Sequence, residues 1–145
     1  MSGNCGRPKS ANGGNNLVLI DASVWVDFFN GVEPALTEVA RLIRRDQALV
    51  AGVAVAEVLR GIKDAARREE TREALLGLRY VEETVDTWIR TGELGRSLDA
   101  VGKVLPLADL HLSALAQQVG AVVYSTDKHF QKVPGIRLHQ PASIK

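Results

Sequence analysis

The sequence is poor in cysteine, in aromatic residues and in excess charge of either sign. Its one cysteine, Cys5, cannot form an internal disulfide or a four-thiolate zinc site, which favours a reducing, intracellular setting. Only 5% of the residues are aromatic, which argues against a stacking platform for single-stranded nucleic acid. Eighteen basic and 17 acidic residues leave a formal charge of +1, which excludes a general basic coat, an acidic tail and a polybasic membrane anchor.

Long hydrophobic runs are also missing. No stretch approaches the roughly 18 apolar residues that a membrane span needs. Residues 1–16 are rich in Gly, Asn and Ser, and the apolar run that follows, 17–20, is too short for a secretory signal. We therefore expect residues 1–16 to be a disordered extension and residues 17–145 to form one domain of a cytoplasmic protein. The 145 residues, 46% of them apolar, are enough for one hydrophobic core.

The apolar patterning alternates between short β-type runs and helical spacing. An α/β domain of three layers is therefore expected, with a short, mainly parallel central sheet flanked by helices. Ser23 is the expected N-cap of the first helix. The helices at 65–78 and 84–104 are expected to form an antiparallel pair. The sequence predicts strands at 17–20, 48–51, 121–124 and 136–138, helices at 24–29, 34–45, 53–62, 65–78, 84–104 and 105–119, and a turn or short helix at 125–130.

Four acidic residues differ from the others because they stand in apolar surroundings. Asp21 and Asp127 follow predicted strands, Glu57 lies in an apolar helix, and Asp109 carries the only formal charge between residues 104 and 126. Burying an ionised carboxylate without a partner costs several kcal/mol. The basic residues concentrate elsewhere in the sequence, so a shared divalent cation is the simplest neutralising partner.

The ligand types indicate which cation. Carboxylates without Cys or His at ligand spacing suit Mg²⁺ or Mn²⁺ rather than zinc. Each acid also has an ordinary structural interpretation. Asp21 and Asp127 would serve as helix N-caps, Glu57 would pair with Arg60, and Asp109 would be a first-turn acid of its helix. One shared metal ion explains the positions of the four acids better than four independent structural roles do.

At this point the sequence resembles the PIN-domain ribonucleases, in particular the VapC-type toxins of toxin–antitoxin pairs. The resemblance spans nearly the whole chain after residue 16, in the order of the family. The motifs that carry it are Val18–Phe29, Val55–Gly61, Leu107–Ala116 and Val123–Phe130, with the closing segment Val133–Leu138.

The resemblance implies a Mg²⁺- or Mn²⁺-dependent endoribonuclease that hydrolyses RNA phosphodiester bonds with a water activated by the metal. The four acids of the family fall on Asp21, Glu57, Asp109 and Asp127, and Ser23 matches its small hydroxyl residue near the metal. Members are usually homodimers that a cognate antitoxin inhibits. Asp27 also matches a common family residue, but we expect it to face solvent.

Phosphate must be held beside these acids, so basic residues should line the rim of the groove. His111 is expected on a helix surface. Trp25 and Trp88 are expected to pack in the core or in a dimer interface rather than to stack on bases. The candidates for RNA binding are Arg60, Lys63, Arg67 and Arg68 after Glu57, and Lys128, His129 and Lys132 after Asp127.

Two other functions remain open at this stage. A receiver-like phosphoacceptor also places acids at the ends of parallel strands, but it needs adjacent acids after the first strand, where this chain has only Asp21. Lys128 beside Asp127 is the only other feature in its favour. The second alternative is a non-catalytic module that only binds RNA or a protein, against which the presence of all four acids argues.

Overall fold

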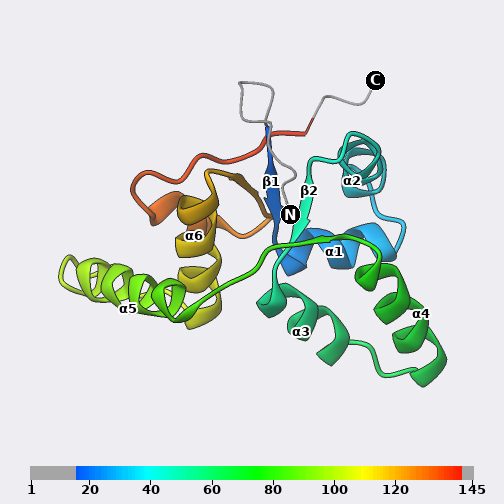
Figure 1. Cartoon of the computed structure of the whole chain (residues 1–145), viewed down its shortest axis with the longest axis horizontal. Coiled ribbons are helices and arrows are strands. Elements are labelled where there is room, and N and C mark those ends of the chain that lie inside the picture. Colours follow the sequence, from blue (N-terminus) through cyan, green and yellow to red (C-terminus); the bar gives the residue numbers. More distant parts are fainter. Residues whose placement is uncertain (1–15, 142–145) are drawn as a thin grey trace, which may run out of the picture.

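The centre of the molecule is a four-stranded parallel sheet with helices on both faces (Figure 1). The computed structural model describes residues 16–141, so Cys5 and the predicted extension, apart from Asn16, lie outside the described residues. The three-layer α/β prediction is confirmed. In the order β3-β2-β1-β4, the strands are β3 (Arg79–Tyr80), β2 (Ala48–Val50), β1 (Val18–Ile20) and β4 (Val122–Tyr124).

Two parts of the sheet differ from the prediction. The edge strand β3 was not expected, because it consists of two exposed residues, Arg79 and Tyr80, without an apolar pattern. The strand expected at 136–138 forms only one bridge, between Leu138 and Val123. β3 is held by its pairing with β2 rather than by an apolar pattern of its own, and such a strand is hard to detect from sequence. Ile136 and Leu138 do pack against the core, but the segment pairs with β4 at one position only.

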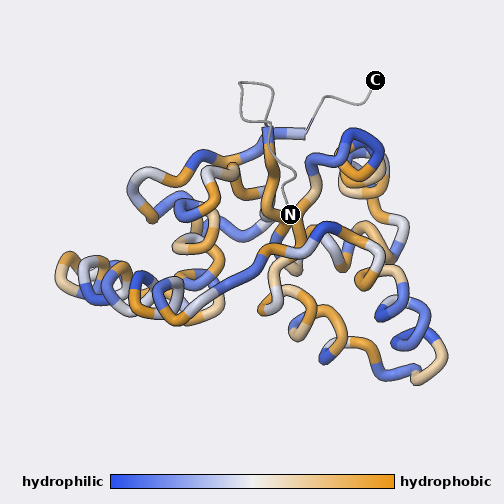
Figure 2. Tube along the Cα trace, in the orientation of Figure 1, coloured by the Kyte–Doolittle hydropathy of each residue, from blue (hydrophilic) through white to orange (hydrophobic). Residues whose placement is uncertain are grey.

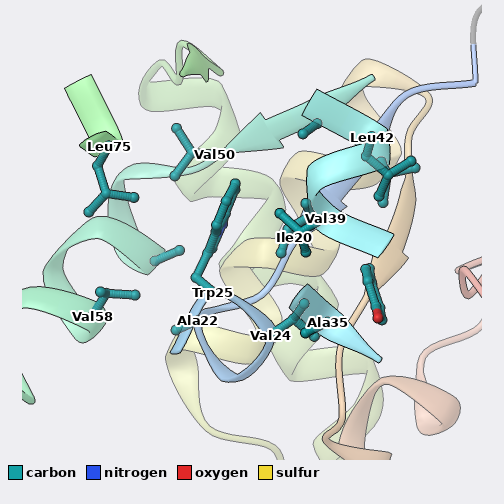
Figure 3. Packing of buried hydrophobic residues seen from close by; sticks show 14 residues of the cluster. Ile20, Ala22, Val24, Trp25, Ala35, Val39, Leu42, Val50, Val58 and Leu75 are labelled. Atoms are coloured by element: carbon teal, nitrogen blue, oxygen red, sulfur yellow. The ribbon is translucent and has the colours of Figure 1, made fainter. Parts of the chain in front are cut away.

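The alternation of side chains along β1 divides the core in two. Val18 and Ile20 pack into one cluster and Leu19 into the other, because successive strand residues point to opposite faces. The first cluster surrounds the fully buried indole of Trp25 (Figure 3), which confirms core packing for this residue. The helices that cover this face are α1 (Ala22–Phe29), α2 (Ala35–Arg44), α3 (Gly52–Arg60) and α4 (Ala65–Leu76).

The other face is covered by α6 (Leu107–Val119), against which α5 (Val85–Asp99) packs (Figure 1). The predicted antiparallel pairing of 65–78 with 84–104 is therefore wrong. The chain crosses the edge of the sheet at β3 between these two helices, which leaves α4 and α5 on opposite sides. Instead, α5 packs against α6, where Leu98 of α5 and Leu110 of α6 share a buried cluster.

The helices begin and end close to the predicted positions. α1 begins at Ala22, so Ser23 lies in its first turn, and the prediction that Ser23 is the N-cap is wrong. The position is taken by Asp21, whose side chain makes no capping bond. Hydrophobic residues line α3, while α4 is hydrophilic over much of its length (Figure 2). Within 16–141, no helix has the length and apolar character needed to cross a membrane.

Candidate metal centre

The carboxyl ends of β1 and β4 bring the first two candidate acids to one edge of the sheet. The two strands are parallel neighbours, with Ile20 paired to Tyr124, and the backbone N–H of Asp21 donates to the carbonyl of Tyr124 at 2.9 Å. Asp21 directly follows β1, and Asp127 lies in the segment that follows β4. Ligand-binding side chains collect at this edge in parallel α/β folds.

A network of hydroxyl groups fixes the Asp21 carboxylate. Ser23 Oγ and Ser125 Oγ both donate to Asp21 Oδ2, at 2.8 and 2.7 Å. The same hydroxyls accept backbone N–H bonds from Thr126 at 3.2 Å and from Asp127 at 2.9 Å. Both bonds go to Oδ2, and neither hydroxyl bonds Oδ1 of Asp21. Ser23 thus contacts the first candidate acid, and its place beside a metal stays a prediction.

Ser125 is a member of the site that the sequence analysis missed. It was included only in a turn or short helix at 125–130. The available signal was a hydroxyl residue between a strand and the candidate acid Asp127, in the sequence Ser-Thr-Asp. Such a residue can accept a bond from the turn and donate one to a carboxylate on the neighbouring strand.

Asp109 and Asp127 lie close together with His129 between them. Asp109 comes from the first turn of α6, and its side chain is only 13% exposed. His129 Nδ1 lies 2.7 Å from Asp109 Oδ2 and 3.2 Å from Asp127 Oδ1. One ligand atom from each of the three residues lies within 4.8 Å of the others, a spacing that could hold a metal ion.

The sequence showed no histidine at ligand spacing and placed His129 on the basic rim, but the structure puts its imidazole against two of the acids. The short helix η3 (Lys128–Lys132) begins after Asp127, whose Oδ1 accepts the backbone N–H of His129 at 2.9 Å. Asp127 therefore does serve as an N-cap. The cap turns the imidazole back toward Asp109, which the spacing along the chain does not reveal.

The charges of the acids act on one another. Burial raises the pKa of Glu57, and the negative charges of Asp21 and Asp109 raise it further. Burial also raises the pKa of Asp109; the hydrogen bond from His129 opposes this, while Asp127 and Asp21 add to it. Glu57 lies on α3 and Asp109 on α6, so two helices and the ends of two strands, β1 and β4, carry these acids. Asp21, Glu57 and Asp127 are each close enough for their charges to act together with that of Asp109, but only Asp109 and Asp127 belong to the group whose ligand atoms lie within 4.8 Å of one another.

The donor set fits a hard divalent cation, because carboxylate oxygens dominate it. Burial, and after it the negative charge of neighbouring acids, raises the pKa of both Glu57 and Asp109, so a bound cation would favour their ionised forms. Asp109 and Asp127, together with His129, have ligand atoms close enough together to hold one ion, and Asp21 is outside this group. Glu57 is more exposed and would join them from α3.

The basic residues predicted to bind RNA fall into two groups. The guanidinium of Arg67 bonds the carbonyl of Phe29 at 3.4 Å and the side chain of Asn30, and that of Arg68 bonds the carbonyls of residues 62 and 63, at 2.8 and 3.2 Å. These two arginines brace the ends of α1 and α3. In contrast, the side chains of the exposed residues Arg60, Lys63 and Lys128 have no ion-pair partner within the described part of the chain.

His111 is not on a helix surface, as the sequence analysis expected, but is 1% exposed. Its ring stacks on Trp88, with 3.9 Å between centroids, and its Nε2 lies 2.6 Å from Glu83 Oε1. The contact with α5 buries it. Trp88 itself is 47% exposed, so it is not a core residue. Asp27 is half-buried on α1, rather than facing open solvent, and is not part of the cluster around His129.

Residues 18–136 match the family model of the PIN domain. No curated protein sequence shows significant similarity to the chain. The match covers the strands, the helices and all four candidate acids.

Solved structures show the same fold. A chain of VapBC2 from Rickettsia felis, bound to a DNA fragment from its promoter, aligns with a TM-score of 0.74 and 16% identity over 85% of this chain and 97% of its own. A toxin–antitoxin complex from Klebsiella pneumoniae gives 0.70 and 23% over 88% and 99%. The toxin VapC20 from Mycobacterium tuberculosis, which cleaves the sarcin–ricin loop, gives 0.62 and 13% over 83% and 98%.

Proposed function

The chain belongs to the PIN-domain family, and we propose that it is a divalent-metal-dependent endoribonuclease that serves as the toxin of a toxin–antitoxin pair. The observation that carries the proposal is the cluster of Asp109, Asp127 and His129, whose ligand atoms lie within 4.8 Å of one another, with Asp21 and Glu57 near enough for their charges to act on the other acids. Burial and neighbouring negative charge both disfavour the ionised forms of Glu57 and Asp109, and a site that binds a cation explains why these acids lie together.

Asp21, Asp109 and Asp127 would hold the cation, with Glu57 beside it. When bound, Mg²⁺ or Mn²⁺ would supply a Lewis acid that offsets the charge developing on the phosphodiester and promotes the attack of water. Ser23 and Ser125 orient the carboxylate of Asp21 through its Oδ2 and leave its Oδ1 for the ion.

Two other groups would handle protons. Glu57 is exposed to solvent and has a raised pKa, so its carboxylate is a stronger base than that of an ordinary glutamate and can accept a proton from water. The Nδ1–H of His129 would donate to Asp109 Oδ2 and so favour the ionised form of this carboxyl, whose pKa burial raises. Both roles require the folded arrangement, since the residues come from α3, α6 and η3.

The substrate proposed is RNA, which the exposed bases Arg60, Lys63 and Lys128 would hold by its phosphates. Lys63 and Arg67 line a pocket of about 380 Å³ at the ends of α1 and α3, in which a nucleotide could be accommodated. Arg67 contributes positive charge to this pocket, although its guanidinium group also bonds the carbonyl of Phe29; Arg68, which bonds the carbonyls of residues 62 and 63, does not line the pocket.

The proposed partners are a cognate antitoxin, which inhibits the nuclease, and a second copy of the chain. The solved complexes of the same fold from Rickettsia felis and Klebsiella pneumoniae support the antitoxin. Exposed apolar residues on α5 support a homodimer, because Val85, Trp88 and Ile89 are 74%, 47% and 53% exposed. An RNA substrate and an antitoxin made in the same cell would place this activity in the cytoplasm.

The test is cleavage of total cellular RNA by the purified protein, with Mg²⁺, with Mn²⁺ and with a chelator, followed by mapping of the new ends. We expect specific cuts that disappear on chelation. Asp21→Asn and Asp109→Asn should abolish them while circular dichroism shows a retained fold. Glu70→Gln, which neutralises an exposed acid far from the site, is the matched control and should cut normally. Full cleavage by Asp109→Asn would refute the proposal.

The two alternatives are separated by direct measurements. A receiver-like phosphoacceptor would form a stable aspartyl phosphate with a small phosphodonor, and the PIN-domain match argues against it. A non-catalytic binding module would show no saturable heat when titrated with Mn²⁺. We expect saturable Mn²⁺ binding that Asp109→Asn weakens.

A further inference from the structure

A second polar site lies at the opposite end of the sheet from the acids. A pocket of about 470 Å³ opens where β1 and β4 begin, and Val18 and Val122 line it. Its other walls are the end of α2 and the C-terminal segment 137–140, which passes the amino end of β1 (Figure 1). Since the acids follow the carboxyl ends of the same strands, the sheet separates this pocket from the candidate metal centre.

The pocket is rich in cationic side chains. Arg41, Arg45 and Arg137 line it together with His139. Arg45 has no ion-pair partner within residues 16–141, and Arg137 makes only a long bond of 3.5 Å to the carbonyl of Gly120. The sequence outside these residues contains no Asp or Glu that could pair with them.

Nearby negative charge does not balance these arginines. Glu38 offsets one of them, because its carboxylate bonds Arg41 at 2.6 and 3.1 Å and His139 Nε2 at 2.6 Å. The neighbouring acid Asp46 pairs instead with Arg79. The ends of α2 and α6 also meet the pocket, and each contributes a partial charge of about −0.5. Glu38 and the two helix ends together offset about two of the three arginine charges, so with His139 neutral roughly one positive charge remains. Neutralising the helix ends therefore does not explain why all three arginines are present.

The volume of the pocket and its apolar wall limit the kind of ligand that it can bind. Leu17, Leu42 and Leu138 line the pocket beside the arginines. A volume of about 470 Å³ falls in the range of small-molecule sites and has room for one nucleotide rather than a polymer. Arginine recognises phosphate with two parallel hydrogen bonds, which lysine cannot form.

We propose that this pocket binds a terminal phosphate monoester attached to one nucleoside, with Arg45 and Arg137 contacting the phosphate and the leucines packing on the nucleoside. The ligand is either a free mononucleotide or the phosphorylated 5′ end of an oligonucleotide, which share this chemistry. The site is independent of the candidate metal centre.

The test is calorimetric titration of the full chain in the presence of a chelator, which prevents metal-mediated binding of phosphate at the acids. The probes are AMP, adenosine and a 5′-phosphorylated trinucleotide with 2′-O-methyl groups, which resists cleavage. We expect saturable binding of AMP or of the trinucleotide, the stronger of the two identifying the source, and at least tenfold weaker binding of adenosine, which lacks the phosphate.

Variants decide where the ligand binds. Arg45→Ala and Arg137→Ala should each weaken binding by about tenfold or more, since each removes a charge-assisted contact. Arg44→Ala removes the same charge from the same end of α2 outside the pocket and should bind normally, as should Asp109→Asn. Equal losses for Arg44→Ala and Arg45→Ala would indicate diffuse attraction and overturn the proposal. Undiminished binding by Arg45→Ala and Arg137→Ala, or no binding of any phosphorylated probe, would also overturn it.

Discussion

His129 Nδ1 lies 2.7 Å from Asp109 Oδ2, although the two residues are 20 positions apart in the sequence. The contact joins η3 to the start of α6. It opposes the effect of burial on the Asp109 carboxyl, because burial raises its pKa whereas the bond from the imidazole lowers it. His129 thus favours the ionised form of Asp109, which is the form that binds a cation.

Replacing His129 with alanine should therefore raise the pKa of Asp109. The variant loses both the hydrogen bond and the charge of the imidazole, which are the two contributions that lower this pKa. Carbon-13 NMR of the carboxyl group across a pH titration measures the shift in the absence of metal. His139→Ala removes an imidazole at the other end of the sheet and should leave Asp109 unchanged. An unchanged or lower pKa in His129→Ala would contradict this account.

Ser125→Ala should lower both stability and activity. The hydroxyl donates to Asp21 Oδ2 and accepts the N–H of Asp127, so two bonds are lost at once. We expect a loss of about 1–2 kcal/mol in the free energy of unfolding and about a tenfold loss of RNA cleavage. Urea denaturation and a cleavage assay measure the two effects. Ser97→Ala removes an exposed hydroxyl bound to the carbonyl of Leu94 and should change neither by a comparable amount.

Glu57→Gln should slightly stabilise the protein at neutral pH when no divalent cation is present. A raised pKa in the folded state means that the ionised carboxylate costs stability once the pH exceeds that pKa. The gain should be no more than about 0.5 kcal/mol, because solvent screens an exposed group, and should vanish below pH 4.5, the ordinary value for glutamate. Thermal unfolding in a chelator measures it.

Added Mn²⁺ should make the wild-type chain more stable than Glu57→Gln. A cation that binds only the folded state raises its stability, and the wild-type chain has one more carboxylate to bind it. We expect a larger increase in melting temperature for the wild type than for Glu57→Gln. Equal increases would show that Glu57 takes no part in binding the ion.

Glu38→Gln should destabilise the protein in a pH-dependent manner. The hydrogen bond from Arg41 lowers the pKa of Glu38, burial opposes it, and His139 adds to the lowering. A lowered pKa contributes stability above the unfolded value of 4.5 and loses it as the pH falls through the folded value. We expect a loss of about 1–3 kcal/mol at pH 7 that shrinks below pH 4.5. Denaturation curves at several pH values measure it, with Glu70→Gln as the control. A loss independent of pH would show that packing, not charge, is responsible.

The hydrophobic pattern was sufficient for most of the sheet and the helices. Val18–Ile20 and Val122–Tyr124 are short apolar runs of the kind that is typical of a buried strand, and both form strands of the sheet. β3 was not predicted because Arg79 and Tyr80 are exposed and their pairing depends on β2. The partner of α5 was also missed, because periodicity shows that a helix has an apolar face but not which surface covers it.

The sequence by itself determined which carboxylates would cost free energy on burial, because an acidic residue among apolar neighbours can be recognised without knowing the fold. That information singled out Asp21, Glu57, Asp109 and Asp127. Only the tertiary structure decided which groups surround them. Ser125 and His129 reach the acids through a strand pairing and a short helical turn. The arginines at the other end of the sheet likewise form one pocket only because α2 and the C-terminal segment meet there. Proximity between residues distant in the sequence depends on the path of the backbone, which local composition does not encode.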